Sequence, residues 1–471
     1  MAKSGKYGTL SKNTLLFTIN SFGSKIITFL LVPLYTYVLT TEDYGKADLM
    51  TSTAQLLIPL LTLNIQDAVL RFSLDKVKNR NEVFSVGIAI NTVATAFLGL
   101  VLLLLSSFNI IPIEREYIVF LFLSFAFGGF YNTLQMYTKA IDKVSILVIS
   151  GITSTLIICA SNLLLLLVFK IGVIGYLISS LLGHLIAAII MLIGGKIYKD
   201  IHIIKDKKLL KEMLVFSSPL VLNSVAWWVN TGSDKYILTF FCGAAVNGVY
   251  SVAYKIPSIL STLQMIFYNA WSVSAITEFD KDDKDGFIGN IYSLYSCVST
   301  IGCSFILIFN ILLAKILYAK DFFEAWHCVP FLVLGAVFNG LALFDGCLFT
   351  AVKRTKEVSR TTLIGAVLNT ILNFALIPFI GSIGAALATM LGYCAVWAAR
   401  TILLRKIIIM KVDWKRQIVL IILLLCQTLL ALFRNAMIFQ IPILILIVAL
   451  QFKLLTNVVD KVLSKVRKHR T

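Results

Sequence analysis

The chain has 471 residues, of which 58% are hydrophobic and only 14% are charged, and its mean hydropathy is +0.89. Soluble globular domains carry roughly 25% charged residues, so this composition excludes a soluble protein and predicts an integral membrane protein. The formal net charge of +18 raises the alternative of a nucleic-acid partner, which the placement of the charges argues against below.

Runs of about 20 apolar residues predict 14 membrane-spanning helices. The first run is about 25 residues long and has no small-residue cleavage site, so we expect a retained helix and not a signal peptide. All loops between the runs are short, and the predicted fold is therefore all-α. The approximate spans are residues 14–38, 47–69, 83–107, 117–137, 145–168, 173–195, 213–233, 245–270, 287–313, 326–350, 358–379, 382–404, 416–433 and 437–456.

The basic residues are distributed unevenly between the two sets of loops. With the N-terminus inside, the loops on that side hold most of the 42 lysine and arginine residues. Cytoplasmic loops of membrane proteins carry such an excess. We therefore predict that both termini are cytoplasmic, that the positive charge is an orientation signal, and that there is no nucleic-acid partner.

The first span contains a lysine near its centre. Lys25 lies about 12 residues, or roughly 18 Å, from either end of the helix, whereas a lysine side chain reaches only about 6 Å and cannot extend to the interface from there. Insertion of such a cation costs about 2.5–3.5 kcal/mol, and Lys255 in the span 245–270 poses the same problem. Two interpretations remain open: an anionic cargo such as a phosphate, or a carboxylate on a helix that the sequence does not align.

Four of the predicted helices carry a polar stripe at helical spacing. We expect the stripes to line one aqueous cavity, although hydroxyl and amide side chains also join helices directly. The stripe residues are Asn20, Ser21, Ser24, Lys25 and Thr28 on the first helix, Asp48, Ser52, Gln55, Pro59, Thr62 and Gln66 on the second, Asn223, Trp227, Asn230 and Asp234 on the seventh, and Ser251, Lys255, Ser258, Thr262 and Asn269 on the eighth.

The two halves of the chain contain an internal repeat. The segment IGVIGYLISSLLG at residues 171–183 aligns without gaps to IGSIGAALATMLG at residues 380–392, and Gly45 matches Gly248 at a similar offset. The repeat predicts two pseudo-symmetric six-helix bundles, residues 1–212 and 213–408. Residues 409–471 form two extra C-terminal helices with a basic cytoplasmic tail. Parallel bundles of this kind support alternating access, with the substrate site between the halves.

The sequence contains no motif that would indicate an enzyme. GxxxxGK[ST], HExxH and GxSxG are all missing, and the eight cysteines have no paired spacing. We therefore expect no catalytic residue, no cofactor and no metal site. The acidic segment TEFDKDDKDG, Thr277 to Gly286, is interpreted as a solvated connector and not a cation site.

The candidate substrate-binding residues follow from the stripes and the intramembrane charges. Trp227 offers a ring on which a sugar could stack, and the lysines offer ammonium groups for a phosphate. The full set is Lys25, Asp48, Gln55, Trp227, Asn230, Asp234, Lys235 and Lys255.

Several segments resemble the polysaccharide transporter family, the O-antigen and capsule repeat-unit flippases of the multidrug/oligosaccharidyl-lipid/polysaccharide exporter superfamily. They are FGSKIITFLLVPLYTYVLTTEDYGKADL, LNIQDAVLRF, WWVNTGSDKYILTFFCGAAVNGVYSVAYKIPSIL and the two Gly-x-x-Gly helix starts. The resemblance covers about residues 10–405. Lys25 matches a basic residue of the related lipid II flippases, whereas their second basic residue on that helix has no counterpart in FLLVPLY, which argues against lipid II itself as the substrate.

The resemblance implies a cationic central cavity and export of undecaprenyl-pyrophosphate-linked oligosaccharide from the inner to the outer leaflet of a bacterial cytoplasmic membrane. The implied partners are this lipid-linked oligosaccharide, membrane lipids, and polymerase and chain-length proteins of the glycan pathway. A drug or metabolite exporter of the same superfamily is the alternative. A membrane-embedded glycan polymerase or ligase fits less well, because such enzymes generally need a large external loop.

Overall fold

The computed structural model describes residues 23–75, 78–108, 114–202, 204, 206–277 and 279–468. The regular structure of these residues is helical, which confirms the predicted all-α class. The stripe residues Asn20 and Ser21 lie outside the described residues. The chain divides into two compact units, Met1–Tyr236 and Ile237–Thr471, and each is described by itself.

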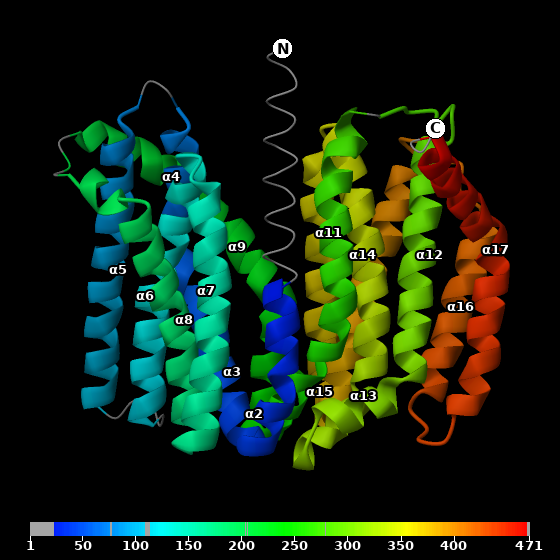
Figure 1. Ribbon diagram of the computed structural model, residues 1–471, viewed down its shortest axis with the longest axis horizontal. Helices are drawn as coiled ribbons and strands as arrows, with labels where there is room; N and C mark the ends of the chain where they lie inside the picture. Colours follow the sequence, from blue (N-terminus) through cyan, green and yellow to red (C-terminus); the bar gives the residue numbers. More distant parts are fainter. Residues whose placement is uncertain are drawn as a thin grey trace. The chain divides into compact units, whose positions relative to one another are not determined.

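Unit 1 is a bundle of helices in which α3, α5, α6, α7 and α8 lie side by side (Figure 1). An apolar helix, Gly23–Val38, precedes them and includes α2. The elements are α2 (Val32–Val38), α3 (Thr41–Leu61), α4 (Ile65–Ser73), α5 (Arg80–Ser107), α6 (Arg115–Ala140), α7 (Val144–Asn162), the π-helical turn η1 (Leu163–Val168), α8 (Gly172–Gly194), the 3-10 turn η2 (Ile197–Asp200) and α9 (Lys207–Cys242), whose last residues belong to unit 2.

The helix predicted over residues 47–69 is broken in the structure. α3 ends at Leu61 and α4 starts at Ile65, with an angle of 56° between them. Pro59 supplies no N–H to the helix, and Leu63 and Asn64 adopt φ values of 53° and 54°, in the left-handed region. The prediction of one polar stripe along the whole span is therefore wrong, because Gln66 lies beyond the break.

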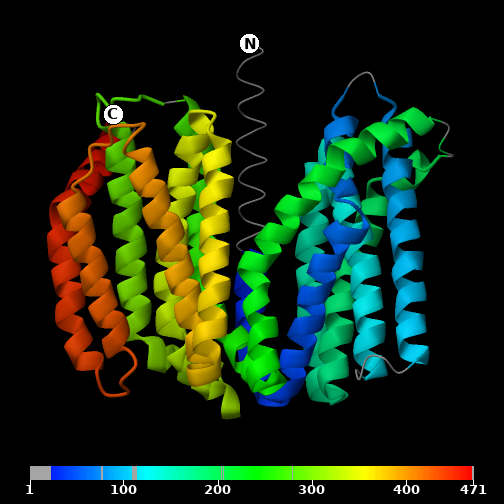
Figure 2. The ribbon, with the colours of Figure 1, turned by 180° about the vertical axis from the view of Figure 1, so that it is seen from behind.

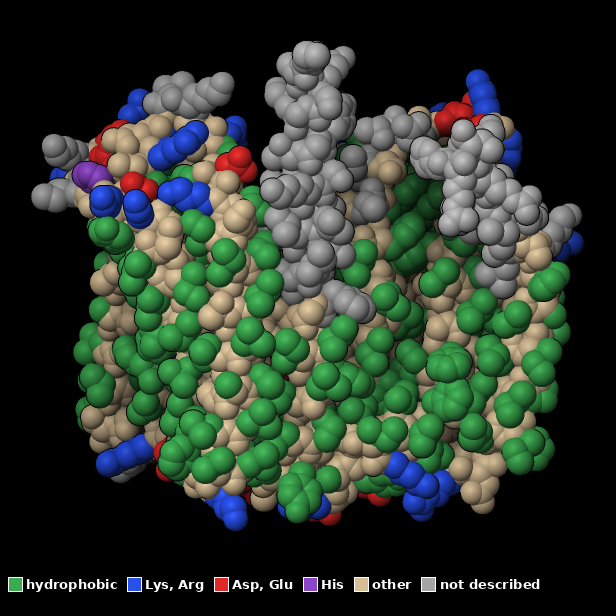
Figure 3. Space-filling view, viewed as in Figure 1, with side chains coloured by type: hydrophobic (Ala, Val, Ile, Leu, Met, Phe, Trp, Pro, Cys, Tyr) green, Lys and Arg blue, Asp and Glu red, His purple; other side chains and the backbone are tan. Residues whose placement is uncertain are grey.

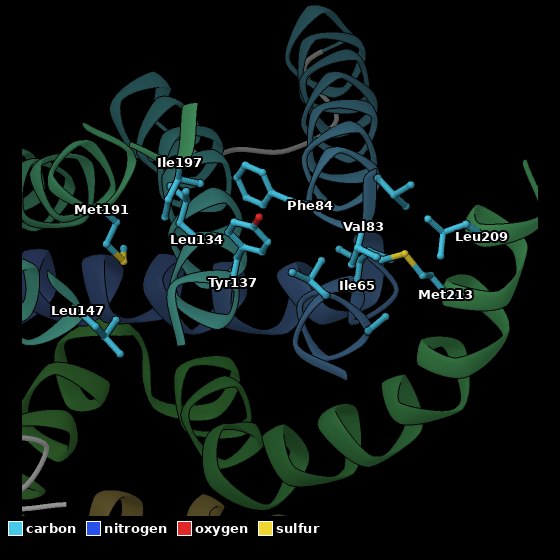
Figure 4. Close-up of a cluster of buried hydrophobic side chains, with 13 residues drawn as sticks. Ile65, Val83, Phe84, Leu134, Tyr137, Leu147, Met191, Ile197, Leu209 and Met213 are labelled. Carbon is cyan, nitrogen blue, oxygen red and sulfur yellow. The ribbon is translucent and has the colours of Figure 1, made fainter. Parts of the chain in front are cut away.

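A cluster of apolar side chains forms the core at one end of unit 1 (Figure 4). The rings of Phe84 and Tyr137 stack with centroids 4.4 Å apart, and Met213 brings the start of α9 into the same cluster as Val83. The Tyr137 hydroxyl donates to Asp200 at 3.0 Å, so its polar end is satisfied at the rim of the core. This packing anchors the start of α9, whose later residues line the candidate site.

Unit 2 is also a helical bundle, seen from behind in Figure 2. Apart from the end of α9, its elements are α10 (Ala244–Ala253), α11 (Lys255–Thr277), α12 (Phe287–Ile308), α13 (Asn310–Leu317), the 3-10 segment η3 (Lys320–His327), α14 (Val329–Ala351), α15 (Thr355–Leu404), α16 (Trp414–Leu430) and α17 (Met437–Lys468). α14 forms its centre, since most of its residues are buried.

Two aligned glycines of the sequence repeat both have a positive φ. Gly172 has a φ of 57° and Gly381 a φ of 54°, values that side chains with a Cβ rarely adopt. Gly172 is the first residue of α8, and Gly381 lies at the break inside α15. Both glycines therefore mark the start of a helical segment.

The apolar helices are long enough to cross a membrane. Within the described residues, eight helices pass this test, or nine if α3 and α4 form one bent span. α15 has 50 residues, about 75 Å, which is too long for a hydrocarbon core of about 30 Å. The non-helical residues Ile380 and Gly381 divide it, in agreement with the predicted spans 358–379 and 382–404.

The distribution of apolar and basic side chains on the surface of each unit is that of a membrane protein. Apolar side chains cover the middle of each unit, and Lys and Arg gather at its ends (Figure 3). The chain is thus a multi-pass membrane protein.

The acidic loop before α12 is exposed at Asp282, Lys284 and Asp285, as a solvated connector would be, but Asp283 is fully buried. Its carboxylate accepts hydrogen bonds from the backbone N–H groups of Ile288 at 2.9 Å, Gly289 at 2.9 Å and Lys411 at 3.0 Å. The first two amides belong to the first turn of α12, and the third to the segment between α15 and α16. Asp283 therefore joins two connections at one end of unit 2.

Candidate functional site

The candidate site lies where α3 and α9 pack against each other in unit 1. Thr40 caps α3, its hydroxyl accepting from the Asp43 N–H at 3.1 Å, and Asp206 caps α9 by accepting from the backbone N–H groups of Lys208 and Leu209. Polar contacts join the two helices, among them Ser52 with Trp228 and Asp48 with Lys235, and Asn64, in the break after α3, bonds to Ser224 of α9. We call the Asp48–Lys235 pair, together with Ser52, Trp228, Asp234 and Tyr236, the α3–α9 site.

An ion pair stands at the centre of the α3–α9 site. The Nζ of Lys235 lies 2.8 Å from Oδ2 of Asp48 and donates to the hydroxyl of Ser52 at 3.3 Å. Asp48 and Ser52 are one helical turn apart, so both face α9. The Lys235 side chain is 17% exposed and that of Asp48 21%, so the pair is largely removed from solvent while both charges are compensated.

A second carboxylate adjoins this pair. Asp234 is 3% exposed, and its Oδ1 accepts from the backbone N–H of Lys235 at 2.9 Å. The site thus contains two carboxylates and one ammonium group: Asp48 on α3, and Asp234 and Lys235 on α9. Such a group of acceptors suits hydroxyl donors, and its lysine contributes to both ion pairing and hydrogen bonding.

Two aromatic side chains of α9 contact α3 beside the ion pair. The indole N–H of Trp228 donates to the Ser52 carbonyl at 2.8 Å, and its ring lies against Tyr236 with centroids 5.3 Å apart. The Tyr236 hydroxyl bonds to Thr53 and to the Leu49 carbonyl. Trp228 and Tyr236 therefore fix the position of α3 against α9.

Tyr44, one helical turn before Asp48, belongs to a cluster of three tyrosines. The rings of Tyr35 and Tyr176 meet edge to face at 4.9 Å, and Tyr44 lies 5.7 Å from Tyr176. They come from α2, α3 and α8, so the start of α3 is held by two neighbouring helices.

The other predicted residues are not members of this ion pair. Gln55 is exposed, and Trp227, adjacent to the buried Trp228, is 56% exposed. The side chain of Asn230 lies outside the described structure. In unit 2, Lys255 is half-buried at the first residue of α11.

Lys25 is exposed on the helix Gly23–Val38. Its neighbour Ser24 accepts a hydrogen bond from Thr155 of α7 at 2.9 Å, which fixes this helix against the bundle. Among the described residues, no carboxylate forms an ion pair with Lys25. The ammonium group of Lys235 is neutralised by Asp48, whereas no described carboxylate neutralises that of Lys25.

The sequence placed Asp48 and Lys235 among the candidate residues but did not pair them, and Trp228 and Tyr236 were not among the candidates. The available signals were the stripe on α3, which put Asp48 and Ser52 on one face, and the stripe that ended at Asp234, the neighbour of Lys235. The described residues contain no group of three or more His, Cys, Asp or Glu side chains that could hold a metal ion.

The fold is similar to the folds of solved multi-pass membrane transporters. A solved structure of the lipid II flippase MurJ, inward closed, matches 94% of this chain and 100% of its own with a TM-score of 0.70 and 16% identity. An inward-facing multidrug resistance MATE family transporter of the MOP superfamily matches 83% of this chain and 97% of its own, with a TM-score of 0.64 and 12% identity. At these identities the likeness concerns the fold alone.

The family follows from the sequence. The family model described as "Polysaccharide biosynthesis protein" matches residues 10–272, more than half of the chain, and the protein belongs to this family. Uncharacterized membrane protein MJ1068 of Methanocaldococcus jannaschii is 26% identical over 243 residues. That match spans about half of each protein, 48% of this chain and 47% of the relative.

Proposed function

We propose that this protein is a flippase of the bacterial cytoplasmic membrane. It would translocate undecaprenyl-pyrophosphate-linked oligosaccharide repeat units from the inner to the outer leaflet by alternating access. Membership of the polysaccharide biosynthesis family and the flippase-like fold support this class. The observation that carries the proposal is the pair of contrasting lysines in unit 1: Lys235 is neutralised by Asp48, whereas Lys25 is exposed on an apolar helix without an ion pair among the described residues.

The proposal assigns each candidate residue a role. Lys25 binds the pyrophosphate as a point charge, as lysine does in phosphate sites, and Lys255 is proposed for the same anion. Asp48, Asp234, Gln55 and Asn230 accept hydrogen bonds from sugar hydroxyls, and Lys235 holds the Asp48 carboxylate in position. The exposed ring of Trp227 stacks on a sugar face.

The proposed architecture retains two six-helix bundles, residues 1–212 and 213–408, with residues 409–471 as two extra helices and a basic tail. Both termini are cytoplasmic in this proposal. Rocking of the bundles would open the site to each side in turn. Polymerase and chain-length proteins of the glycan pathway would receive the product.

A drug or metabolite exporter is the second candidate, because the MATE transporter structure matches 83% of this chain. The two functions differ in the charge and size of the cargo. A pyrophosphate-linked glycan needs a cation, whereas a drug exporter has no requirement for a free lysine in the first helix.

The test is complementation of a flippase-null host that depends on this chain for surface glycan. We expect Lys25→Ala to abolish surface glycan, Lys25→Arg to retain part of it, and Lys208→Ala, at an exposed lysine beside the start of α9, to leave it unchanged. Lipid extracts of the Lys25→Ala strain should accumulate the undecaprenyl-pyrophosphate oligosaccharide on the cytoplasmic side. Full surface glycan from a normally expressed Lys25→Ala variant would overturn the charge assignment, and unchanged lipid pools in a deletion strain would overturn the flippase.

A further inference from the structure

Unit 2 contains a cavity that the proposed transport site does not use. Its volume is about 400 Å³, and it lies between the end of α12, α13 and the turn that joins α16 to α17. α13 and this turn are found at the same end of unit 2 (Figure 1). The cavity therefore stands at one end of the membrane-spanning helices, the level at which lipid headgroups meet protein.

Two buried amide side chains line this cavity. Asn310 is 1% exposed and Gln440 3% exposed. The Asn310 amide nitrogen donates to the Trp326 carbonyl at 3.0 Å, which fixes its orientation. The side-chain oxygens of Asn310 and Gln440 have no hydrogen-bond partner among the described residues. Since buried polar groups are nearly always hydrogen-bonded, these two oxygens are available as acceptors for a ligand that brings donors.

Two cationic side chains also line the cavity, Lys315 and Arg434. The guanidinium carbon of Arg434 lies 5.5 Å from the centroid of the Phe323 ring, so this side chain is held against η3 by a cation–π contact. No ion pair with a carboxylate of the described residues neutralises either cation. The charge of the cavity suits an anion, and a phosphate accepts hydrogen bonds from both side chains.

The rest of the cavity lining is apolar. Leu312 and Met437 line it and are 51% and 44% exposed. An acyl chain lying along these side chains would cover them from the membrane side. The combination of cations, hydrogen-bond acceptors and an apolar wall matches an amphiphile with a phosphate and adjacent donors.

We infer that this cavity binds the headgroup of an anionic glycerophospholipid, with phosphatidylglycerol as the fitting chemistry. Lys315 and Arg434 bind the phosphate, and the headgroup hydroxyls donate to the side-chain oxygens of Asn310 and Gln440. The acyl chains extend along Leu312 and Met437. The bound lipid joins α13 to the turn between α16 and α17 and so stabilises the C-terminal hairpin. The inference does not depend on the transported substrate.

The test measures lipid binding to the purified full-length chain by native mass spectrometry and by thermal unfolding in detergent. The probes are phosphatidylglycerol, phosphatidylcholine and inorganic phosphate. We expect phosphatidylglycerol to bind and to raise the unfolding temperature more than phosphatidylcholine, which has a phosphate but no headgroup donor. Equal effects of the two lipids, or full competition by inorganic phosphate, would overturn the assignment.

Variants locate the effect in this cavity. Lys315→Gln combined with Arg434→Gln should weaken phosphatidylglycerol binding about tenfold or more, because each basic residue near an anionic headgroup contributes about fivefold. Lys356→Gln removes the same charge from an exposed position at the start of α15 and should leave binding unchanged. Gln440→Leu removes one acceptor and should reduce the preference for phosphatidylglycerol over phosphatidylcholine. Unchanged affinity in the double variant would exclude the cavity as the site.

Discussion

Asp48 and Lys235 form an ion pair at 2.8 Å although they are far apart in the sequence. The pair joins α3 to α9, and Ser52 supplies a third partner to the lysine. A buried charge without its partner is strongly destabilising, whereas the pair as a whole contributes little. The contact therefore makes α3 and α9 depend on each other, and it compensates the charge of Lys235.

Replacing Asp48 should destabilise unit 1 more than replacing both members of the pair. Asp48→Asn leaves Lys235 without its counter-charge, and we expect a loss of about 1–3 kcal/mol, reduced from the value for fully buried pairs because both side chains are partly exposed. Asp48→Asn combined with Lys235→Met should recover most of this loss. Thermal unfolding in detergent measures both. Equal stabilities of the single and double variants would show that the pair is not coupled.

The two adjacent tryptophans on α9 should differ in their effect on stability. Trp228→Phe removes the indole N–H that bonds the Ser52 carbonyl, and we expect a loss of about 0.5–1.5 kcal/mol. Trp227→Phe is the matched control, since Trp227 is 56% exposed and its replacement should change unfolding by less than about 0.5 kcal/mol. Under the proposed function, Trp227→Ala should instead lower glycan export at normal expression. A larger stability loss for Trp227→Phe than for Trp228→Phe would contradict the structure.

The third glycine of the first repeat segment should tolerate no side chain. A Cβ at Gly183 would overlap Ile158 of α7, and we expect Gly183→Ala to cost about 1–3 kcal/mol in unfolding free energy. Gly194→Ala is the control on the same helix, because the nearest side-chain atom to its Cβ would be 3.9 Å away. Expression level and unfolding temperature report the difference. Equal tolerance at both positions would argue against close packing of α7 and α8.

Removal of the Asp283 carboxylate should loosen the connections at one end of unit 2. Asp283→Ala leaves the amides of Ile288, Gly289 and Lys411 without their acceptor, and hydrogen exchange at these amides should become faster. Asp282→Asn, at an exposed position of the same loop, should leave exchange at these amides unchanged. Unaltered protection in Asp283→Ala would show that other contacts hold the loop.

Local features of the sequence were sufficient for a large part of the fold. Apolar runs predicted the all-α membrane class because hydrocarbon requires every backbone hydrogen bond to be made within the segment. The alignment of residues 171–183 with 380–392 predicted equivalent helix starts, and Gly172 and Gly381 both have a positive φ, which glycine adopts more readily than other residues.

Helix breaks were predicted less reliably. Pro59 and Asn64 are local signals of the break between α3 and α4, but proline also occurs inside membrane helices that stay continuous, so the sequence did not distinguish the two. The burial of Asp283 was missed because its third partner, Lys411, is contributed by a distant connection.

The sequence by itself determined that this is a multi-pass helical membrane protein of the polysaccharide biosynthesis family, and it identified the intramembrane charges as the residues to explain. Only the tertiary structure decided which charges of the candidate residues are compensated. Which carboxylate meets which lysine depends on how one helix is rotated and shifted against another, and helical periodicity in the sequence does not determine this. Packing of α3 on α9 gave Lys235 a carboxylate, and left Lys25 exposed on its helix.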